Sequence, residues 1–232
     1  AELVAEKWNL SREDLDKFAL ESHQKASNAT ESKYFDREIL PVEGKNAEGI
    51  NEMVIADEGI RFDASLDKLA GLNPVTEGGV ITAGNASQIT DGAAAVMICN
   101  DAGLKKIQSN PRAEIVSISV VGDDPVFMLT GPIPASHKAL EAANLTIEDI
   151  DLYEVNEAFA PVPLAWAHDL KADKSKLNVN GGAMALGHPL GATGAKLMTT
   201  LLHEMERRES TYGLQAICEG GGTANATIIK RI

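Results

Sequence analysis

One histidine and one cysteine lie in segments with more glycine than a regular helix or strand tolerates. His188 belongs to Asn180-Gly-Gly-Ala-Met-Ala-Leu-Gly-His-Pro-Leu-Gly-Ala-Thr-Gly194, and Cys218 begins Cys218-Glu-Gly-Gly-Gly222. Glycine costs roughly 0.5–1 kcal/mol inside a regular element, so such clusters indicate tight turns or a backbone that approaches another molecule closely. A histidine and a cysteine held by these turns can move protons near neutral pH.

His188 is followed by Pro189, and proline restricts the residue before it to extended geometry. The imidazole is therefore expected at a strand-to-helix turn. In open α/β sheets, ligands gather at the carboxyl ends of strands, where such a turn lies. The alternative is a loop histidine that only hydrogen-bonds the backbone.

Cys218 closes an apolar strand and stands just before Gly220-Gly-Gly222, whose N–H groups can stabilise an oxyanion. A thiol with an ordinary pKa of about 8.5 can exchange protons with a carbon acid if a cationic partner lowers that value. The alternative is a buried, inert structural thiol. Cys99 lacks such flanks and is expected in the core.

Asn156 and Glu157 follow a third predicted strand. At such a place they can orient a water molecule and a neighbouring ring. The alternative is a helix N-cap by Asn156 with Glu157 in the first turn. The remaining histidines lie on predicted helices and need no functional role; they are His23, His137, His168 and His203.

The elements that position these residues follow an α/β pattern with helices covering a sheet. From residue 111 onward the pattern predicts βαβαβαββ, with strands at 114–121, 150–155, 177–179, 214–218 and 224–230 and helices at 134–144, 160–170 and 191–208. Upstream it predicts a helix capped by Ser11 and Asp14, short strands at 39–42 and 53–55, and a short helix at 65–71. The apolar run 93–99 has the length of a buried strand.

Composition restricts the class of protein. The 232 residues are 44% hydrophobic and 24% charged, with a net charge of -13. Those values are typical of a globular protein and argue against a general nucleic-acid binder. Two cysteines without paired spacing give neither a disulfide framework nor a zinc pattern, which favours a reducing, cytoplasmic location. No apolar run approaches the length of a membrane span, and no membrane partner is expected.

Several of these segments together resemble the thiolases, the acetyl-CoA C-acyltransferase family. The matching segments are Asn156-Glu-Ala-Phe159, Asn180-Gly-Gly-Ala183 with Gly187-His188-Pro189, Cys218-Glu-Gly-Gly-Gly222, Gly84-Asn-Ala-Ser-Gln-Ile-Thr-Asp-Gly-Ala93 and Gly131-Pro-Ile-Pro134. The resemblance runs in order from residue 1 to residue 232. It implies the thiolase fold, in which two similar βαβαβαββ halves stack face to face and the first half carries an inserted loop domain.

The resemblance implies a role for each matching residue. His188 would activate a nucleophilic cysteine and contribute to an oxyanion hole, which a water molecule held by Asn156 completes. Cys218 would be the acid/base for the α-proton of an acyl-CoA, and the Gly220 N–H would hold the acyl-enzyme oxyanion. Four residues would contact CoA: Ser87 at the pantetheine arm, Ala158 and Phe159 along its tunnel, and Arg61 near the nucleotide end. The substrates are CoA thioesters, and neither a metal nor a redox cofactor is required.

The chain also departs from the family pattern. Neither cysteine occupies the position of the family's nucleophile, which lies upstream of the segment that matches Ala1. The chain is therefore divided into part of the loop domain (1–79), the last helix and strand of the first half (80–110) and the complete second half (111–232). On this division it is expected to expose an apolar face and, alone, to have no thiolase turnover.

Several interpretations follow. The chain is a fragment of an ordinary, homo-oligomeric thiolase, or one subunit of a split enzyme whose partner chain carries the N-terminal half and the nucleophile. The reaction is thiolytic cleavage of a 3-oxoacyl-CoA or the reverse Claisen condensation. A non-catalytic CoA-binding or assembly subunit is the alternative from another class, and a ketoacyl-synthase-like condensing enzyme is disfavoured by the motif around Cys218.

Overall fold

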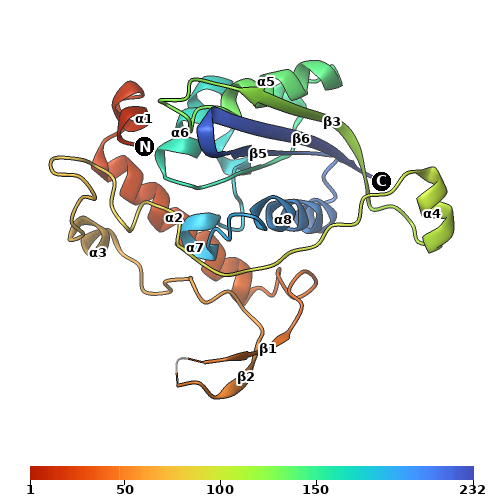
Figure 1. The fold of residues 1–232 in the computed structure, drawn as a ribbon, viewed down its shortest axis with the longest axis horizontal. Helices are drawn as coiled ribbons and strands as arrows, with labels where there is room; N and C mark the ends of the chain where they lie inside the picture. The colour runs from red at the N-terminus through yellow and green to blue at the C-terminus, as the bar shows by residue number, and fades with distance from the viewer. Residues whose placement is uncertain (47) are drawn as a thin grey trace.

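The computed structural model describes residues 1–46 and 48–232. Its centre is a four-stranded sheet in the order β3-β6-β5-β4, with α5 on one face and α8 on the other (Figure 1). A two-stranded hairpin and an extended segment that leads to α4 reach out from this body (Figure 1). None of the helices within the described ranges is long and apolar enough to cross a membrane.

The sheet mixes parallel and antiparallel pairing. β3 (Ala113–Gly122) and β5 (Tyr212–Cys218) both pair antiparallel with β6 (Thr223–Arg231), whereas β4 (Leu152–Val155) runs parallel to β5. Every residue of β4 is buried. Because β4 and β5 are parallel neighbours, their carboxyl ends meet at one edge of the sheet.

The edge strand β3 has two different faces. Ser117 and Ser119 point toward α5 (Pro132–Ala143) and donate hydrogen bonds to its carbonyl oxygens at 2.8 and 2.6 Å. Ile118 and Val120 alternate with them and are exposed, as the period of two in a strand requires. Apolar side chains are also exposed along the segment 89–98, most of all Ile89.

The helices bury large side chains against the sheet. α6 (Pro161–Leu170) lies beside α5, and its Trp166 stacks edge-on against Tyr153 of β4 with ring centroids 5.3 Å apart. On the opposite face, α8 (Thr193–Arg208) packs against Gly213 of β5, where a Cβ atom would lie 2.5 Å from the sulfur of Met205. Both α5 and α6 begin with a proline, which fits a first helical turn.

The N-terminal part is mainly helical. α1 (Glu2–Lys7) contacts α6, and α2 (Arg12–Glu31) packs against α3 (Leu66–Ala70) and the short α7 (Ala183–Leu186). The predicted cap of α2 is confirmed, because Ser11 and Asp14 exchange side-chain-to-backbone hydrogen bonds. Single 3₁₀ turns occur at Ile147–Asp149, Lys174–Lys176 and Gly220–Gly222.

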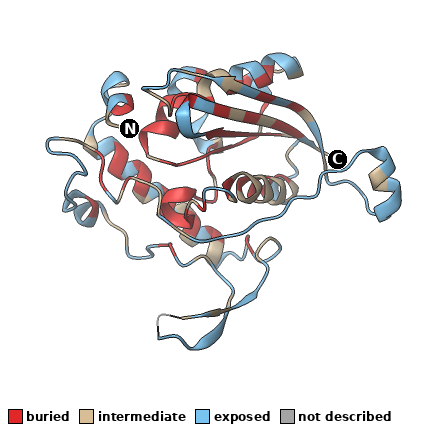
Figure 2. Cartoon of the chain, viewed as in Figure 1, coloured by how far each residue is buried: buried red, intermediate tan, exposed pale blue. Residues whose placement is uncertain are grey.

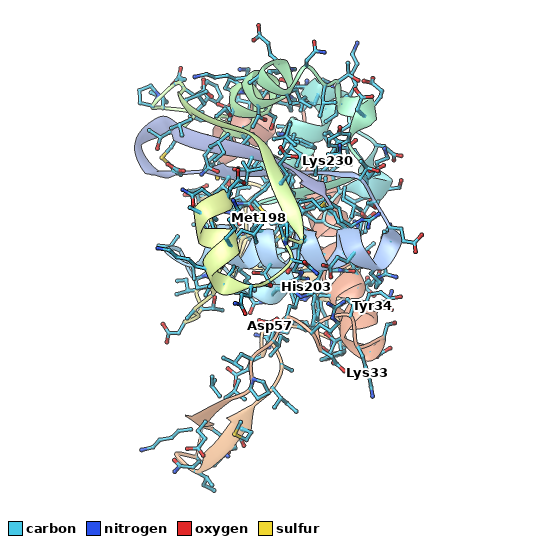
Figure 3. All side chains as sticks on the ribbon, turned by 90° about the vertical axis from the view of Figure 1, so that its right-hand side faces the viewer. Lys33, Tyr34, Asp57, Met198, His203 and Lys230 are labelled. Atoms are coloured by element: carbon cyan, nitrogen blue, oxygen red, sulfur yellow. The ribbon has the colours of Figure 1, made fainter. Side chains whose placement is uncertain are left out.

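The hairpin consists of β1 (Val42–Lys45) and β2 (Asn51–Val54), which pair antiparallel. The predicted short strands at 39–42 and 53–55 overlap it only at their ends. The hairpin projects away from the rest of the chain and is mostly exposed (Figures 2 and 3).

Charged and aromatic residues join α8 to the segment before the hairpin. His203 lies on the side of α8 that faces the region of Tyr34 and Asp57 (Figure 3). Its Nδ1 atom is 3.8 Å from Glu38 Oε2, and the Arg207 guanidinium lies 3.8 Å from the centroid of the Tyr34 ring. Burial raises the pKa of Glu38 to about 7.

Three expectations about the elements are wrong. The run 93–99 forms no strand, and Cys99 is exposed instead of lying in the core. The predicted strand at 177–179 is reduced to an isolated parallel bridge from Leu177 to Tyr153, so the βαβαβαββ pattern contains one regular strand fewer. An apolar run signals burial against something, but it becomes a strand only where a neighbouring backbone pairs with it. Among the described residues, α4 (Asp101–Ile107) follows this run directly and has no buried residue.

Candidate functional site

His188 lies in the turn between α7 and α8, so the predicted turn before a helix is present, but a short helix precedes it in place of the expected strand. Its backbone N–H donates to Gln88 O at 3.1 Å, and the preceding Gly187 has φ +81°. A Cβ atom on Gly187 would lie 2.5 Å from Thr90 Oγ1. Glycine therefore meets both a backbone and a space requirement here, and it lets the half-buried imidazole enter the site.

The hydrogen bonds of His188 determine its tautomer. Nδ1 lies 2.6 Å from Thr193 Oγ1, and the Thr193 hydroxyl itself donates to Pro189 O at 3.1 Å. Because Pro189 O accepts the hydroxyl proton, we assign the imidazole proton to Nδ1, from which it is donated to Thr193. Nε2 is then the basic nitrogen and accepts from Asn156 Nδ2 at 3.3 Å. Burial, with a smaller effect of the Lys196 charge, lowers the pKa of His188, so the ring is neutral at pH 7.

Asn156 follows the last residue of β4 and is 1% exposed. Its backbone N–H donates to Ala216 O of β5 at 3.0 Å. Besides facing His188, its side chain lies close enough to the Cys218 thiol to lower the pKa of that thiol. The alternative of a helix N-cap is wrong, because α6 begins later, after Ala160. One amide thus connects the two residues that the sequence singled out.

Glu157 lies next to Asn156 but points into the protein. Its carboxylate accepts hydrogen bonds from the Ser22 hydroxyl, the Asn178 amide and the Met184 N–H at 2.7 to 3.1 Å. These contacts tie the end of β4 to α2 and α7. Glu157 therefore holds the backbone around the site and does not take part in a helix cap.

Cys218 is the last residue of β5 and is 8% exposed. It packs among Leu129, Ala158, Val162 and Ala165. Burial and, to a smaller extent, the nearby Glu219 raise the pKa of its thiol to about 11, whereas the Asn156 side chain has a weaker, lowering effect. The cationic partner considered from the sequence is not among these influences. The thiol is consequently protonated at neutral pH.

The triple glycine after Cys218 makes a 3₁₀ turn with two left-handed residues, Gly221 at φ +77° and Gly222 at φ +82°. A Cβ atom at Gly222 would meet backbone atoms of residues 123–125 at 3.0 to 3.3 Å, whereas Gly220 has nothing within 4 Å of such an atom. Open space lies next to Gly220, so another molecule can approach its backbone there.

The segment around Ser87 runs alongside the residues that follow Asn156. The Ser87 N–H donates to Ala158 O at 3.0 Å, and Ala86 forms a bridge with Phe159. Ser87, Ala158 and Phe159 are thus brought together beside Cys218. Arg61 is exposed, and its backbone N–H donates to His23 Nδ1 at 3.1 Å. No hydrogen bond or ion pair of its side chain to this group is found among residues 1–46 and 48–232.

Two contributors were not predicted from the sequence. Thr193 fixes the proton of His188, and the Gln88 amide donates to Gly59 O and Met184 O at 2.7 Å each. Gln88 thereby joins three segments that surround His188. The only sequence signal for Thr193 is its position five residues after His188 at the start of a helix, which is too weak to identify it.

Comparisons with known proteins agree with this arrangement. The family description "Thiolase, N-terminal domain" matches residues 1–102, and "Thiolase, C-terminal domain" matches residues 109–231. The chain is 54% identical to a steroid 3-ketoacyl-CoA thiolase of Mycobacterium tuberculosis and 46% identical to a 3-ketoacyl-CoA thiolase of Yersinia enterocolitica. Both alignments include 100% of this chain, but only 56% and 61% of those proteins.

Solved structures give the same result. Human mitochondrial 3-ketoacyl-CoA thiolase matches 99% of this chain and 58% of its own, with a TM-score of 0.95 and 44% identity. The acetyl-CoA acetyltransferase of Bacillus anthracis matches 100% of this chain and 59% of its own, with a TM-score of 0.95 and 41% identity. A structure of the human protein in complex with CoA also matches, with a TM-score of 0.92. The chain thus spans less than two thirds of the length of the proteins it resembles.

Proposed function

Because the chain belongs to the thiolase family, we propose that it supplies the acid–base and oxyanion groups for acyl transfer between CoA thioesters. The observation that carries this proposal is the Asn156 side chain, which contacts both His188 Nε2 and the Cys218 thiol. Three segments that are distant in sequence meet through this one amide. The nucleophilic cysteine is proposed to come from outside these 232 residues. Cys218 is buried beside Asn156 and is proposed for the acid–base role, and Cys99 is exposed and lies outside the group of His188, Asn156 and Cys218.

In this proposal His188 acts first as a base. Its Nε2 lone pair takes the proton of the nucleophilic thiol, while the hydrogen bond from Nδ1 to Thr193 holds the ring in place. The imidazolium then carries a proton on Nε2, and this N–H donates to the developing thioester oxyanion together with a water molecule held by Asn156. The neutral resting state of His188 supports this order of events.

Cys218 handles the proton at carbon. In thiolysis the nucleophilic thiolate adds to the 3-oxo carbon of a 3-oxoacyl-CoA; as this adduct collapses to the acyl-enzyme, the Cα–Cβ bond breaks, its electron pair stays on the α-carbon of the departing acetyl-CoA, and the Cys218 S–H protonates that carbon. The Cys218 thiolate then takes the proton of the incoming CoA thiol, which attacks the acyl-enzyme. The raised pKa of Cys218 supports the acid role, because the thiol starts out protonated. In the condensation direction the same steps run in reverse.

The CoA is proposed to lie along Ser87, Ala158 and Phe159, which are adjacent beside Cys218. The open space at Gly220 suits its N–H for the acyl-enzyme oxyanion. Arg61 is the least supported CoA contact, since its side chain is exposed and unconnected to this group among the described residues. The 3-ketoacyl-CoA substrate class is proposed from the names of the relatives.

The test uses acetoacetyl-CoA and CoA as substrates. The natural protein that contains this chain is expected to catalyse thiolysis, and His188→Ala and Asn156→Ala are expected to reduce kcat by about 10²-fold or more. The purified 232-residue chain, confirmed by intact mass, is expected to show no turnover. Sustained turnover by that chain would refute the external nucleophile. A natural protein that binds CoA without turnover would instead support the alternative of a non-catalytic assembly subunit.

A further inference from the structure

A small enclosed cavity lies behind the catalytic group, between the end of β4 and α8. Its volume of about 10 Å³ is close to the minimum that holds one water molecule. Its lining includes Glu154 and Asn156 at the end of β4 and Thr193, Lys196 and Thr200 of α8. It therefore touches the residue that connects His188 and Cys218.

Two of the lining side chains keep an oxygen atom without a hydrogen-bond partner. They are Glu154 Oε2 and Asn156 Oδ1, and each residue is 1% exposed. Residues two apart on a strand point to the same face, so both side chains reach toward the cavity from β4. Buried polar atoms nearly always have a hydrogen-bond partner. Two oxygen atoms without one, beside a space of about one water molecule, indicate a water that bridges them.

Glu154 differs from the other buried carboxylate at the end of β4. Glu157 accepts three hydrogen bonds, whereas Glu154 accepts none from the residues that the structure describes. A fully buried carboxylate without donors is strongly disfavoured as an anion. A neutral carboxylic acid instead gains a donor, the O–H group, that can use a nearby acceptor.

The charged groups around Glu154 also favour its protonated, neutral form. Burial raises its pKa well above the ordinary value, and the carboxylates of Glu157, Glu38 and Glu204 raise it further. The positive charge of Lys25 lowers the pKa of Glu154, but its ammonium group already donates a hydrogen bond to Leu177 O at 3.0 Å. Lys196 lines the cavity from α8, where it donates to Leu186 O and lies 3.6 Å from Asp57.

We propose that Glu154 is a positioning residue that keeps its proton in the resting protein and donates it in a hydrogen bond to one water molecule in this cavity. That water donates to Asn156 Oδ1, and the Thr200 hydroxyl can accept its second hydrogen. The chain of hydrogen bonds fixes the Asn156 amide with Nδ2 toward His188 and Cys218. An amide turned the other way would present an oxygen to the basic His188 Nε2, so the orientation matters for the chemistry. This inference rests on the proposed function of Asn156.

The test compares three variants of the natural protein. Glu154→Gln keeps a neutral donor, Glu154→Met keeps the volume without a donor, and Gln215→Met is the matched control. Gln215 is the neighbour of Glu154 on β5, is 4% exposed against 1% for Glu154, and also has an unpaired oxygen, but it does not line the cavity. We expect Glu154→Gln and Gln215→Met to retain kcat within about threefold, and Glu154→Met to lose about tenfold or more with a KM for CoA changed less than twofold.

Two readouts separate a positioning role from a packing role. The pH profile of kcat should differ on its high-pH side between wild type and Glu154→Gln, because only the wild type can lose the Glu154 proton, whereas the loss due to Cys218 ionisation is common to both. The wild-type minus variant infrared difference spectrum at pH 7 should contain the carbonyl band of a protonated buried carboxylic acid for both Glu154 variants, because the contribution of Glu38, whose pKa is about 7, cancels in the difference. The band tests the protonation of Glu154 even if the protein proves not to turn over. A Glu154→Met protein with wild-type kcat, a Glu154→Gln protein as impaired as Glu154→Met, or an absent band would overturn the proposal.

Discussion

The Cys218 thiol should be unusually resistant to alkylation. Burial raises its pKa from 9.0 to about 11. At pH 8 a thiol of pKa about 11 is roughly 0.1% thiolate, against roughly 10% for a pKa of 9, a difference of about 100-fold. A thiolate of higher pKa is more nucleophilic, with a Brønsted coefficient of about 0.4–0.5. Its greater nucleophilicity raises the rate by about 6- to 10-fold and so offsets part of the lower thiolate fraction. Alkylation is therefore expected to be about 10- to 16-fold slower than at an unperturbed thiol, and slower still because the sulfur is buried.

The assay is reaction of the natural protein with iodoacetamide from pH 7 to pH 10, followed by mass spectrometry of the peptides that contain Cys218 and Cys99. Cys99 is exposed in the 232-residue chain, so the same reaction with that chain gives the reference rate for Cys99. The logarithm of the rate constant for Cys218 should rise by about one per pH unit over the whole range, as it does below a pKa. The Asn156→Ala variant should react more slowly at a given pH through loss of the side chain that lowers the pKa of the thiol. A rate that levels off below pH 9, or a Cys218 that reacts as fast as Cys99, would refute the reasoning.

Two further predictions concern the surroundings of the site. Between the ordinary pKa of 4.5 and the raised value of about 7, Glu38 holds a proton in the folded state but not in the unfolded state. The resulting stabilisation is present at low pH and is lost as the pH rises through that window. The change in the free energy of unfolding is at most about 3 kcal/mol. Glu38→Gln should therefore flatten the decline in the free energy of urea unfolding between pH 5 and pH 8, and an unchanged slope would count against the buried, protonated Glu38. Gly187→Ala should destabilise the protein by about 1–3 kcal/mol and reduce thiolysis, because φ is +81° and the added methyl group meets Thr90 at 2.5 Å; full activity with an unchanged melting temperature would contradict this.

The sequence was sufficient to identify the residues whose type and flanking residues indicate a chemical role. His188, Cys218 and Asn156 each follow a predicted element beside glycines or at a strand end, and the structure brings all three together through Asn156. Residues that act through three-dimensional neighbours were missed. Glu154 is one acidic residue in an apolar strand, and nothing in its sequence indicates that its carboxyl group lacks a donor and lines a cavity.

The errors in the fold have a similar physical origin. The alternating and apolar patterns predicted β3, β5 and β6 correctly. These segments form strands because each pairs with a neighbouring strand inside the chain. The run 93–99 has an equally apolar sequence, but no strand pairs with it among the described residues. The pKa of Cys218 was also beyond the sequence, because the raised value comes from the apolar side chains of α6 and of the loop before α5, which no local pattern places there.

The central claim is that Cys218 serves the carbon–carbon step while His188 and Asn156 serve the acylation of a nucleophile outside this chain. Cys218→Ala in the natural protein separates the two steps. With labelled acetyl-CoA, the variant is expected to form the acyl-enzyme more slowly than wild type, because Cys218 also protonates the leaving CoA thiolate, but this loss should be smaller than that of acetoacetyl-CoA thiolysis and its reverse, which should fall by about 10²–10⁴-fold. Thiolysis at the wild-type rate, or equal loss of acylation and thiolysis, would contradict the assignment.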